Sequence, residues 1–350
     1  MEGLVKKILM LGNLGYVGPE LTKLLRRKYP NCQLVGYDTG YFAKHYTTPS
    51  IAPDHLLDVQ YYGDVRSFNL DLKDFDSIIA LAAISNDPIG NKFEDVTLDI
   101  NCDSIVSIAN QAKKSGVESF VFASSCSVYG FAEEGDRKEF SDLNPLTAYA
   151  KSKVKAEVEL KEIASSSFKV TCLRFATACG LSDRLRLDLV LNDFVASAIA
   201  TQQIEILSDG LPWRPLIHVK DMGRAIDWAI HRTQKDAYIV VNAGSNSWNY
   251  QVKELAKAVQ KLMPEITVSI NENATPDKRS YRVNFDLFTK LAEGFLPEYD
   301  LETTITELIE GLKGINFKDA NFRKSNLIRL NVINQLLKDN KVDHQLFINK

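Results

Sequence analysis

Short apolar runs alternate with amphipathic stretches along the first half of the chain. The runs are rich in Val, Ile, Leu and Phe, and they lie near residues 7–11, 33–37, 58–62, 77–83, 118–123 and 169–173. Between several of them, apolar residues recur at helical spacing, over residues 16–29, 99–115 and 148–165. Buried strands that alternate with helices predict an α/β fold, a Rossmann doubly wound parallel sheet with ligands at the carboxyl ends of its strands.

The alternation becomes irregular after Arg174. We therefore expect a Rossmann domain over residues 1–175, a smaller mixed α/β substrate-binding lobe over mainly 176–315, and a C-terminal helical extension over 316–350. An apolar run near 238–243 predicts a strand that returns to the main sheet. The extension carries an apolar stripe at helical spacing, and we expect it to pack on its own subunit or on a second copy.

A glycine-rich turn, Gly12-Asn-Leu-Gly15-Tyr-Val-Gly18, joins the first apolar run to the first amphipathic stretch. Such a turn at a helix N-terminus suits a pyrophosphate, because glycine allows close approach and the helix dipole favours negative charge. Twenty residues after Gly18, the second run ends in Asp38. An acid there suits the ribose 2′-hydroxyl of NAD and repels a 2′-phosphate. Spaced glycines alone also fit an ordinary turn, but this order of strand, turn, helix, strand and acid favours NAD as the cofactor.

Composition narrows the class of protein further. The chain has 350 residues and a net charge of −3, so a nucleic-acid partner is not expected. No apolar run reaches the length that crosses a membrane, and no membrane association is expected. The five cysteines are scattered, which favours reduced thiols in a cytoplasmic protein. The five histidines have no metal-binding spacing, so we expect no metal site.

A tyrosine, a lysine and a serine are the candidate catalytic residues. Tyr149 and Lys153 are four residues apart and therefore share one helix face. A phenol has a pKa of about 10, and a neighbouring ammonium, aided by an oxidised nicotinamide, is expected to lower it. Ser125 follows a buried run and lies at the end of a predicted strand, where dinucleotide and substrate should meet. In isolation a Tyr–Lys pair fits a solvated surface, but beside the glycine turn it is interpreted as catalytic.

The chain resembles the extended short-chain dehydrogenases/reductases, in the nucleotide-sugar epimerase/dehydratase branch, from about residue 7 to residue 312. The motifs that carry the resemblance are Gly12-x-x-Gly15-x-x-Gly18, Gly63-Asp64-Val65, Leu81-Ala82-Ala83, Ser125, Tyr129-Gly130, Tyr149-x-x-x-Lys153, Arg174 and Arg214-Pro-Leu-Ile-His218-Val-Lys-Asp221. It implies that Tyr149 is the base and acid, that Lys153 holds the nicotinamide ribose, and that Ser125 bonds the reacting sugar oxygen. It also implies a homodimer formed through the helices near 99–115 and 148–165.

The resemblance also assigns residues to the two ligands. The expected cofactor-binding residues are Gly12, Gly15, Tyr16, Val17, Gly18, Asp38, Asp64, Val65, Leu81, Ala82, Ala83 and Asn101. Asp64 and Val65 are expected to border the adenine, while Leu81 to Ala83 let the backbone pass close to the dinucleotide. The expected substrate-binding residues are Ser85, Cys126, Ser127, Thr177, Asn192, Arg214 and Arg279.

Several of the expected substrate contacts follow from the chemistry of the residue or from the family pattern. Arg214 and Asn192 are expected at the nucleotide diphosphate, for which a planar cation is well suited. Thr177 stands where the family has an asparagine. The family's second phosphate arginine is absent, and Arg279 or Arg282 is a possible substitute. Ser85 begins a polar loop, 85–90, that is expected to shape the sugar pocket.

The reaction type is narrowed by a departure from the family pattern. Sugar 4,6-dehydratases of this family carry Asp-Glu after the residue that matches Ser125, whereas this chain has Cys126 and Ser127. A dehydratase is therefore disfavoured, and an NAD-dependent nucleotide-sugar epimerase is the leading interpretation. A nucleotide-sugar dehydrogenase or ketoreductase is the alternative. A third class, a non-catalytic NAD-binding sensor, is disfavoured because such relatives typically lose the tyrosine or the lysine.

Cys126 leaves a further question open. The Ser-Ser-Cys sequence resembles that of the GDP-fucose synthases, which use a cysteine to move protons beside a ketone, and a tuned thiol suits such a step. The other interpretation is a small buried packing residue.

Overall fold

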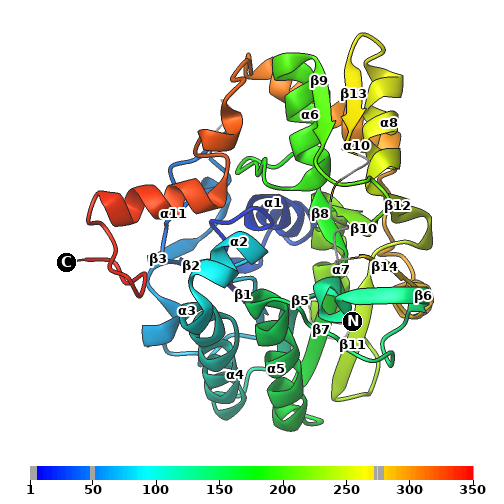
Figure 1. Cartoon of the computed structure of the whole chain (residues 1–350). Helices are drawn as coiled ribbons and strands as arrows, with labels where there is room; N and C mark the ends of the chain where they lie inside the picture. The colour runs from blue at the N-terminus through cyan, green and yellow to red at the C-terminus, as the bar shows by residue number, and fades with distance from the viewer. Residues whose placement is uncertain (1–5, 48–51, 272–273, 275–279, 350) are drawn as a thin grey trace.

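A seven-stranded, fully parallel sheet forms the centre of the protein, whose computed structural model describes residues 6–47, 52–271, 274 and 280–349 (Figure 1). Its strands, in spatial order, are β11 (Tyr238–Ala243), β7 (Lys169–Phe175), β5 (Ser119–Ser125), β4 (Ser77–Ala80), β1 (Lys7–Leu11), β2 (Gln33–Asp38) and β3 (Val59–Tyr62). The order reverses at β1, which creates the crevice where ligands bind in such sheets. The predicted doubly wound fold is thereby confirmed.

Helices cover both faces of this sheet because successive strand residues point to opposite sides. On one face lie α4 (Ser104–Lys114) and α5 (Ala148–Ile163), which pack on Leu9, Ile78 and Phe120. On the other face lie α1 (Gly18–Lys28) and α7 (Val219–His231), which pack on the alternate strand residues. The short helices α2 (Asp87–Lys92) and α3 (Glu94–Leu98) follow β4 in the chain and pack on α5.

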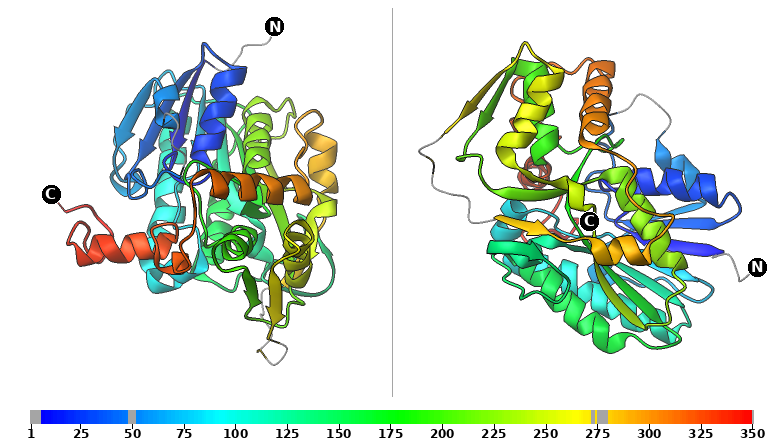
Figure 2. Two further views of the ribbon diagram at one scale, coloured as in Figure 1. Left: turned by 90° about the horizontal axis from the view of Figure 1, so that it is seen from above. Right: turned by 90° about the vertical axis from the view of Figure 1, so that its right-hand side faces the viewer.

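A smaller lobe with its own apolar core lies beyond one end of the sheet (Figure 2). Its helices are α6 (Val190–Thr201), α8 (Val252–Leu262) and α10 (Leu301–Gly314). Its strands form a parallel pair, β9 (Gln203–Ile206) with β13 (Thr267–Ile270), and a three-stranded sheet of β8 (Thr177–Cys179), β10 (Trp213–His218) and β12 (Asn249–Gln251). A further pair, β6 (Phe131–Arg137) with β14 (Ser280–Val283), and α9 (Asp286–Leu291) lie beside the main sheet.

The C-terminal extension returns to the Rossmann part of the chain. It contains α11 (Arg329–Lys338), which contacts α2. Ile333 of α11 and Leu346 belong to the same buried cluster as the α4/α5 face of the sheet. The apolar stripe of the extension is therefore buried, at least in part, on its own chain.

Two elements differ from the sequence pattern. The strand expected over 77–83 ends at Ala80, because the next residues leave the sheet to pass the glycine turn. A Cβ on Gly12 would lie 2.4 Å from the Ala82 nitrogen. The helix expected over 99–115 begins as a π-helical segment, Asp99–Asp103. Within the described residues, no helix is long and apolar enough to cross a membrane.

Candidate active site

A cavity of about 900 Å³ lies at the carboxyl ends of the central strands and continues between the sheet and the smaller lobe. This volume is typical of a ligand site. The predicted site residues that line it are Gly12, Gly15, Tyr16, Val17, Asp38, Asp64, Val65, Leu81, Ala82, Ala83, Ser85, Ser125, Ser127, Tyr149, Lys153, Thr177 and Arg214. The described ones outside its lining are Gly18, Asn101, Cys126 and Asn192. Arg279 falls outside the described residues.

The glycine turn has a shape that only glycine permits. Gly12 has a φ of +81°, in the left-handed region. A Cβ on Gly18 would lie 1.8 Å from the Asn13 carbonyl oxygen. Val17 occupies the N-cap position of α1, and its apolar side chain cannot accept a hydrogen bond from the first turn. The N–H groups at the start of α1 therefore suit an anion such as the pyrophosphate of NAD.

Asp38 is held at the tip of β2 with its carboxylate against this turn. Its two oxygens accept hydrogen bonds from the backbone N–H groups of Leu14, at 3.0 Å, and Gly40, at 2.7 Å. Burial raises the pKa of the Asp38 carboxyl above its ordinary value. The two hydrogen bonds and the nearby arginines oppose this shift without cancelling it. Each carboxylate oxygen retains acceptor capacity for a ribose hydroxyl. The turn and the acid together fit NAD.

Asn101 supports the cofactor wall from behind. Its side-chain amide accepts from the Ile84 N–H at 2.8 Å and donates to the Ile84 carbonyl at 3.0 Å. The amide also donates to the Ser152 hydroxyl at 3.0 Å. Asn101 therefore fixes the segment after β4 to α5 without lining the cavity.

Asp64 is engaged by a neighbour on its own chain. Arg66 donates to both of its carboxylate oxygens, at 3.0 and 2.6 Å. Asp64 still lines the cavity beside Val65, where the resemblance expects the adenine. Its side chain is thus already paired within the protein.

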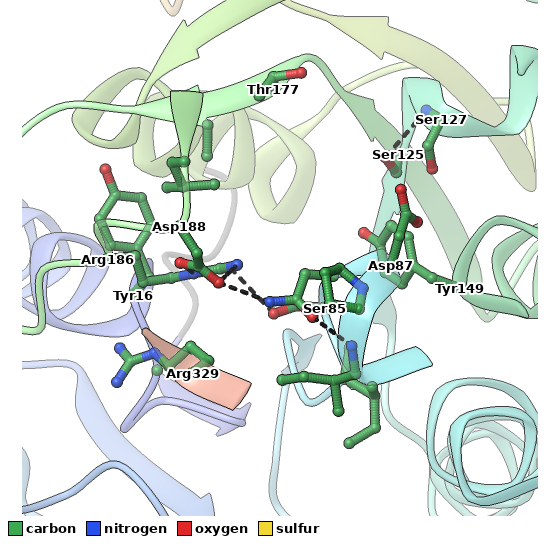
Figure 3. A pocket seen from close by; sticks show the side chains of 18 of the residues that line it. Tyr16, Ser85, Asp87, Ser125, Ser127, Tyr149, Thr177, Arg186, Asp188 and Arg329 are labelled. Carbon is green, nitrogen blue, oxygen red and sulfur yellow. Dashed lines mark hydrogen bonds and ion pairs between the residues drawn. The ribbon is translucent and has the colours of Figure 1, made fainter. Parts of the chain in front are cut away.

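The N-terminus of α5 brings the catalytic candidates together. Thr147 caps the helix by accepting from the Ala150 N–H at 3.2 Å. Lys153, one helical turn after Tyr149, donates to the Ala123 carbonyl of β5 at 2.7 Å. The Lys153 nitrogen lies 5.7 Å from the Tyr149 ring centroid. Ser125, at the end of β5, reaches the same point of the cavity (Figure 3).

Burial shifts the pKa values of Tyr149 and Lys153 in opposite directions. Burial raises the pKa of Tyr149 to about 12, against the lowering effects of Ser125 and Arg186. Burial also lowers the pKa of Lys153 to about 7, although Glu157 opposes that shift. Desolvation thus outweighs the attraction between the two groups when only the chain's own residues act on them. The expected acidification of Tyr149 also requires an oxidised nicotinamide and stays a prediction. The chain's own residues hold Tyr149 as a neutral phenol.

Charged residues outside the predicted site set also line the cavity, and among them Asp87 lies in the loop 85–90 that was expected to shape the sugar pocket, whereas Arg186 and Asp188 were not predicted. Asp87 extends from α2 toward Ser125 and Tyr149 (Figure 3), and its charge contributes to the raised Tyr149 pKa. Arg186 pairs with Asp188, at 2.9 Å. Arg186 also donates to the Ser85 hydroxyl at 3.1 Å and so bridges the two lobes. The alternation of charged and apolar residues over 184–188 was the available signal.

Cys126 does not face the cavity. It is 1% exposed, its thiol donates to the Arg174 carbonyl at 3.1 Å, and burial raises its pKa. A thiol in this position fits the packing interpretation and not the expected contact with substrate.

Asn192 is also not placed as a ligand. It is fully buried, accepts from the Gly180 N–H at 3.0 Å and donates to the Arg186 carbonyl at 2.9 Å. Both bonds tie α6 to the loop between β8 and α6. Asn192 therefore shapes the wall of the cavity from behind, instead of contacting the diphosphate.

Comparison with known proteins assigns the chain to a family. Residues 8–244, which include the glycine turn, Ser125, Tyr149 and Lys153, match the NAD dependent epimerase/dehydratase family. The chain belongs to this family. The predicted class of enzyme, an NAD-dependent epimerase/oxidoreductase of the extended short-chain dehydrogenase/reductase type, and NAD as the cofactor are thereby confirmed.

Three proteins to which this epimerase/dehydratase family member is similar share less than 30% of their residues with it. An uncharacterized UDP-glucose epimerase, YtcB of Bacillus subtilis, is 27% identical over 63% of this chain and 71% of its own length. A UDP-glucose 4-epimerase of Rhizobium meliloti is 23% identical over 86% of this chain and 94% of its own. The solved structure of MoeE5 in complex with UDP-glucose and NAD has a TM-score of 0.74 at 24% identity, and covers 88% of this chain and 98% of its own. That structure supports the fold alone.

Proposed function

We propose that the protein is an NAD-dependent nucleotide-sugar epimerase that acts through a transient keto-sugar, with a UDP-sugar as its substrate. The observation that carries this proposal is the convergence of Ser125, Tyr149 and Lys153 on one cavity that also contains the cofactor motif. The names of the relatives, UDP-glucose epimerases, support UDP as the nucleotide.

The roles of the residues follow from their placement. Bound NAD supplies the acceptor and donor of the sugar's hydride. Tyr149 would act as the phenolate, a form that the positive charge of oxidised NAD would favour. The phenolate takes the proton of the sugar hydroxyl when the hydride leaves, and the phenol returns it when the hydride comes back to the opposite face. Ser125 hydrogen-bonds the same sugar oxygen and the phenol. Lys153 binds the nicotinamide ribose while its ammonium remains on the Ala123 carbonyl.

The substrate lobe supplies the remaining contacts. Arg214 lines the cavity from β10 and is proposed to bind the diphosphate. Ser85, Ser127 and Thr177 also line the cavity and are proposed to contact the sugar.

We also propose that the protein is a homodimer and that it is cytoplasmic. The family resemblance supports a homodimer formed through α4 and α5. The five cysteines are buried and form no disulfide, which supports a cytoplasmic protein.

The proposal is tested by following both epimers of a UDP-sugar with the purified enzyme. UDP-glucose, UDP-N-acetylglucosamine and UDP-glucuronic acid are each incubated with catalytic NAD, and the products are separated by chromatography. An epimerase brings each epimer pair to one ratio from either side, without net NADH. Tyr149→Phe is expected to lower turnover about 10²- to 10⁴-fold, because it removes the proton-transfer group, while NAD affinity stays unchanged.

The other outcomes separate the alternatives. NADH formed in proportion to product would identify a dehydrogenase, and consumption of added NADH with a keto-sugar would identify a ketoreductase. Binding of NAD without turnover of any sugar nucleotide would support a sensor. Full turnover by Tyr149→Phe would reject the catalytic assignment.

A further inference from the structure

The C-terminal extension contributes to the wall of the cofactor cavity. Arg323, Arg329 and Ile333 all line the cavity, although they follow the smaller lobe in sequence. Arg323 is ion-paired with Asp193 at 2.7 Å. Arg329, at the start of α11, has no such ion pair with a described carboxylate.

Arg329 is a buried cation with incomplete pairing. It is 3% exposed, its Nη2 donates to the Arg184 carbonyl at 3.0 Å, and its guanidinium lies 4.2 Å from the Phe42 ring centroid. Its Nη1 has no hydrogen-bond partner. Among the residues that the structure describes, no carboxylate lies within ion-pair distance of it. A buried charge without a partner is costly, so this one is suited to an anion from outside the chain.

The neighbouring arginines strengthen the preference for an anion. Arg184 pairs with Asp54 at 2.9 Å, and Arg186 pairs with Asp188. Burial, and then the positive charge of Arg186, lower the pKa of Arg329 to about 9. The guanidinium nevertheless stays protonated at neutral pH, and its charge lacks the partner that the other two have.

The position of Arg329 indicates which anion it meets. Its charge interacts with Asp38, the acid expected at the cofactor ribose, and with the Arg186–Asp188 pair. In Figure 3, Arg329 lies on the Tyr16 and Arg186 side of the cavity, opposite Ser125 and Tyr149. This is the dinucleotide side, next to the glycine turn and away from the reacting sugar.

We propose that Arg329 binds a phosphate oxygen of the dinucleotide's diphosphate, so that the C-terminal extension is part of the cofactor site. The proposal concerns cofactor binding only and does not depend on which sugar nucleotide is the substrate.

The end of the chain supports this arrangement at the adenine side. The Phe347 ring centroid lies 3.5 Å from the Arg66 guanidinium, and Arg66 donates to the Gln345 carbonyl at 2.6 Å. The Tyr41 hydroxyl donates to the carbonyl of Leu346, which is fully buried. The end of the extension is therefore bonded to Arg66 and Tyr41, and Tyr41 also lines the cavity.

The test compares cofactor binding by three forms of the full-length protein, measured by calorimetry with NAD. Arg329→Gln is expected to weaken NAD binding about 10- to 100-fold, because one charge-assisted hydrogen bond is lost. Lys324→Gln, on the same extension but exposed and outside the cavity lining, is the matched control and is expected to leave NAD affinity within about twofold. The melting temperature of Arg329→Gln without ligand is expected to be unchanged or raised, because a buried unpaired charge is removed.

The anion is identified by titrating NADP and UDP in parallel. If Arg329→Gln weakens UDP binding and spares NAD, the site serves the substrate diphosphate and the proposal is wrong. A loss confined to NADP would assign the arginine to a 2′-phosphate and would also overturn it. Equal NAD affinity in the wild type and Arg329→Gln would reject it outright. Should the Gln variant fail to fold, Arg329→Lys is the second variant: an intermediate NAD affinity supports the proposal and an unchanged one rejects it.

Discussion

At the scale of single residues, desolvation dominates the charges of the candidate active site. Tyr149 and Lys153 approach one another as the sequence predicts, yet burial shifts their pKa values apart to about 12 and about 7. Motifs give the spacing of such groups along a helix. They do not give the number of polar atoms around each group, and that number decides which protonation state the protein itself favours.

Replacing Lys153 by methionine is expected to stabilise the protein and to abolish turnover. The folded-state pKa of Lys153 is about 7, below the unfolded value of about 10.4. Between these values the unfolded chain binds more protons, so the wild type gains stability as pH rises. The Met variant has no ammonium at this position and therefore lacks this rise in stability with pH. Its advantage in free energy of unfolding, about 1–4 kcal/mol at pH 6, therefore declines by pH 9.

Urea unfolding at pH 6 and pH 9 measures this difference. Lys155→Met, on the same helix but exposed, is the control and should show no pH-dependent gain. An advantage of Lys153→Met that is equal at both pH values would mean that the ammonium is not desolvated.

At the scale of elements, the turn between β1 and α1 is where sequence and structure agree best. Its glycines are required by contacts with neighbours: Gly12 faces Ala82, and Gly18 faces Asn13. The contact of Gly18 with Asn13 is local in sequence, and the spacing of the glycines was sufficient to predict the turn. The contact of Gly12 with Ala82 joins distant segments and was not predicted by the pattern. The strand that ends early at Ala80 shows the limit of that approach, since its end is set by the turn that it passes.

Gly18→Ala isolates this steric requirement. The added Cβ would overlap the Asn13 carbonyl, and we expect the free energy of unfolding to fall by about 1–3 kcal/mol or more. NAD affinity is expected to fall with it, because the overlap displaces the turn. Gly314→Ala, at the end of α10 with no described atom within 4 Å of the new Cβ, is the matched control. Its stability should be unchanged or raised by up to about 1 kcal/mol. Wild-type stability and NAD affinity in Gly18→Ala would contradict the argument.

At the scale of the whole molecule, the contacts that sequence reasoning missed join segments that are far apart in the chain. Arg186 reaches Ser85 across 101 residues, and Arg329 reaches the carbonyl of Arg184 across 145. The sheet order and the Ser125, Tyr149 and Lys153 group follow from local periodicity and motif. The pairing of Arg186 with Ser85 depends on how two lobes and an extension pack, for which a single sequence holds no local signal.

The packing of the two lobes against each other also determines the role of Asn192. Tyr16, from the glycine turn, donates to the Gly180 carbonyl at 2.5 Å, and Asn192 donates to the Tyr16 hydroxyl at 3.2 Å. Ser182 donates to the Tyr16 carbonyl at 2.7 Å. The cofactor turn is thus bonded directly to the substrate lobe, and Asn192 strengthens that connection.

A double-mutant cycle tests this connection. Tyr16→Phe and Asn192→Ala are each expected to lower the free energy of unfolding by about 1–3 kcal/mol, since each leaves buried polar groups unpaired. Because the two changes remove one shared hydrogen bond, the double variant should lose less than the sum, by about 0.5–1 kcal/mol. Tyr61→Phe, at a site 43% exposed, is the control and should have no effect. If Asn192 instead contacts the substrate diphosphate, Asn192→Ala will lose UDP affinity, keep its stability and show no coupling with Tyr16→Phe. That result would restore the sequence assignment and remove the connection between the lobes.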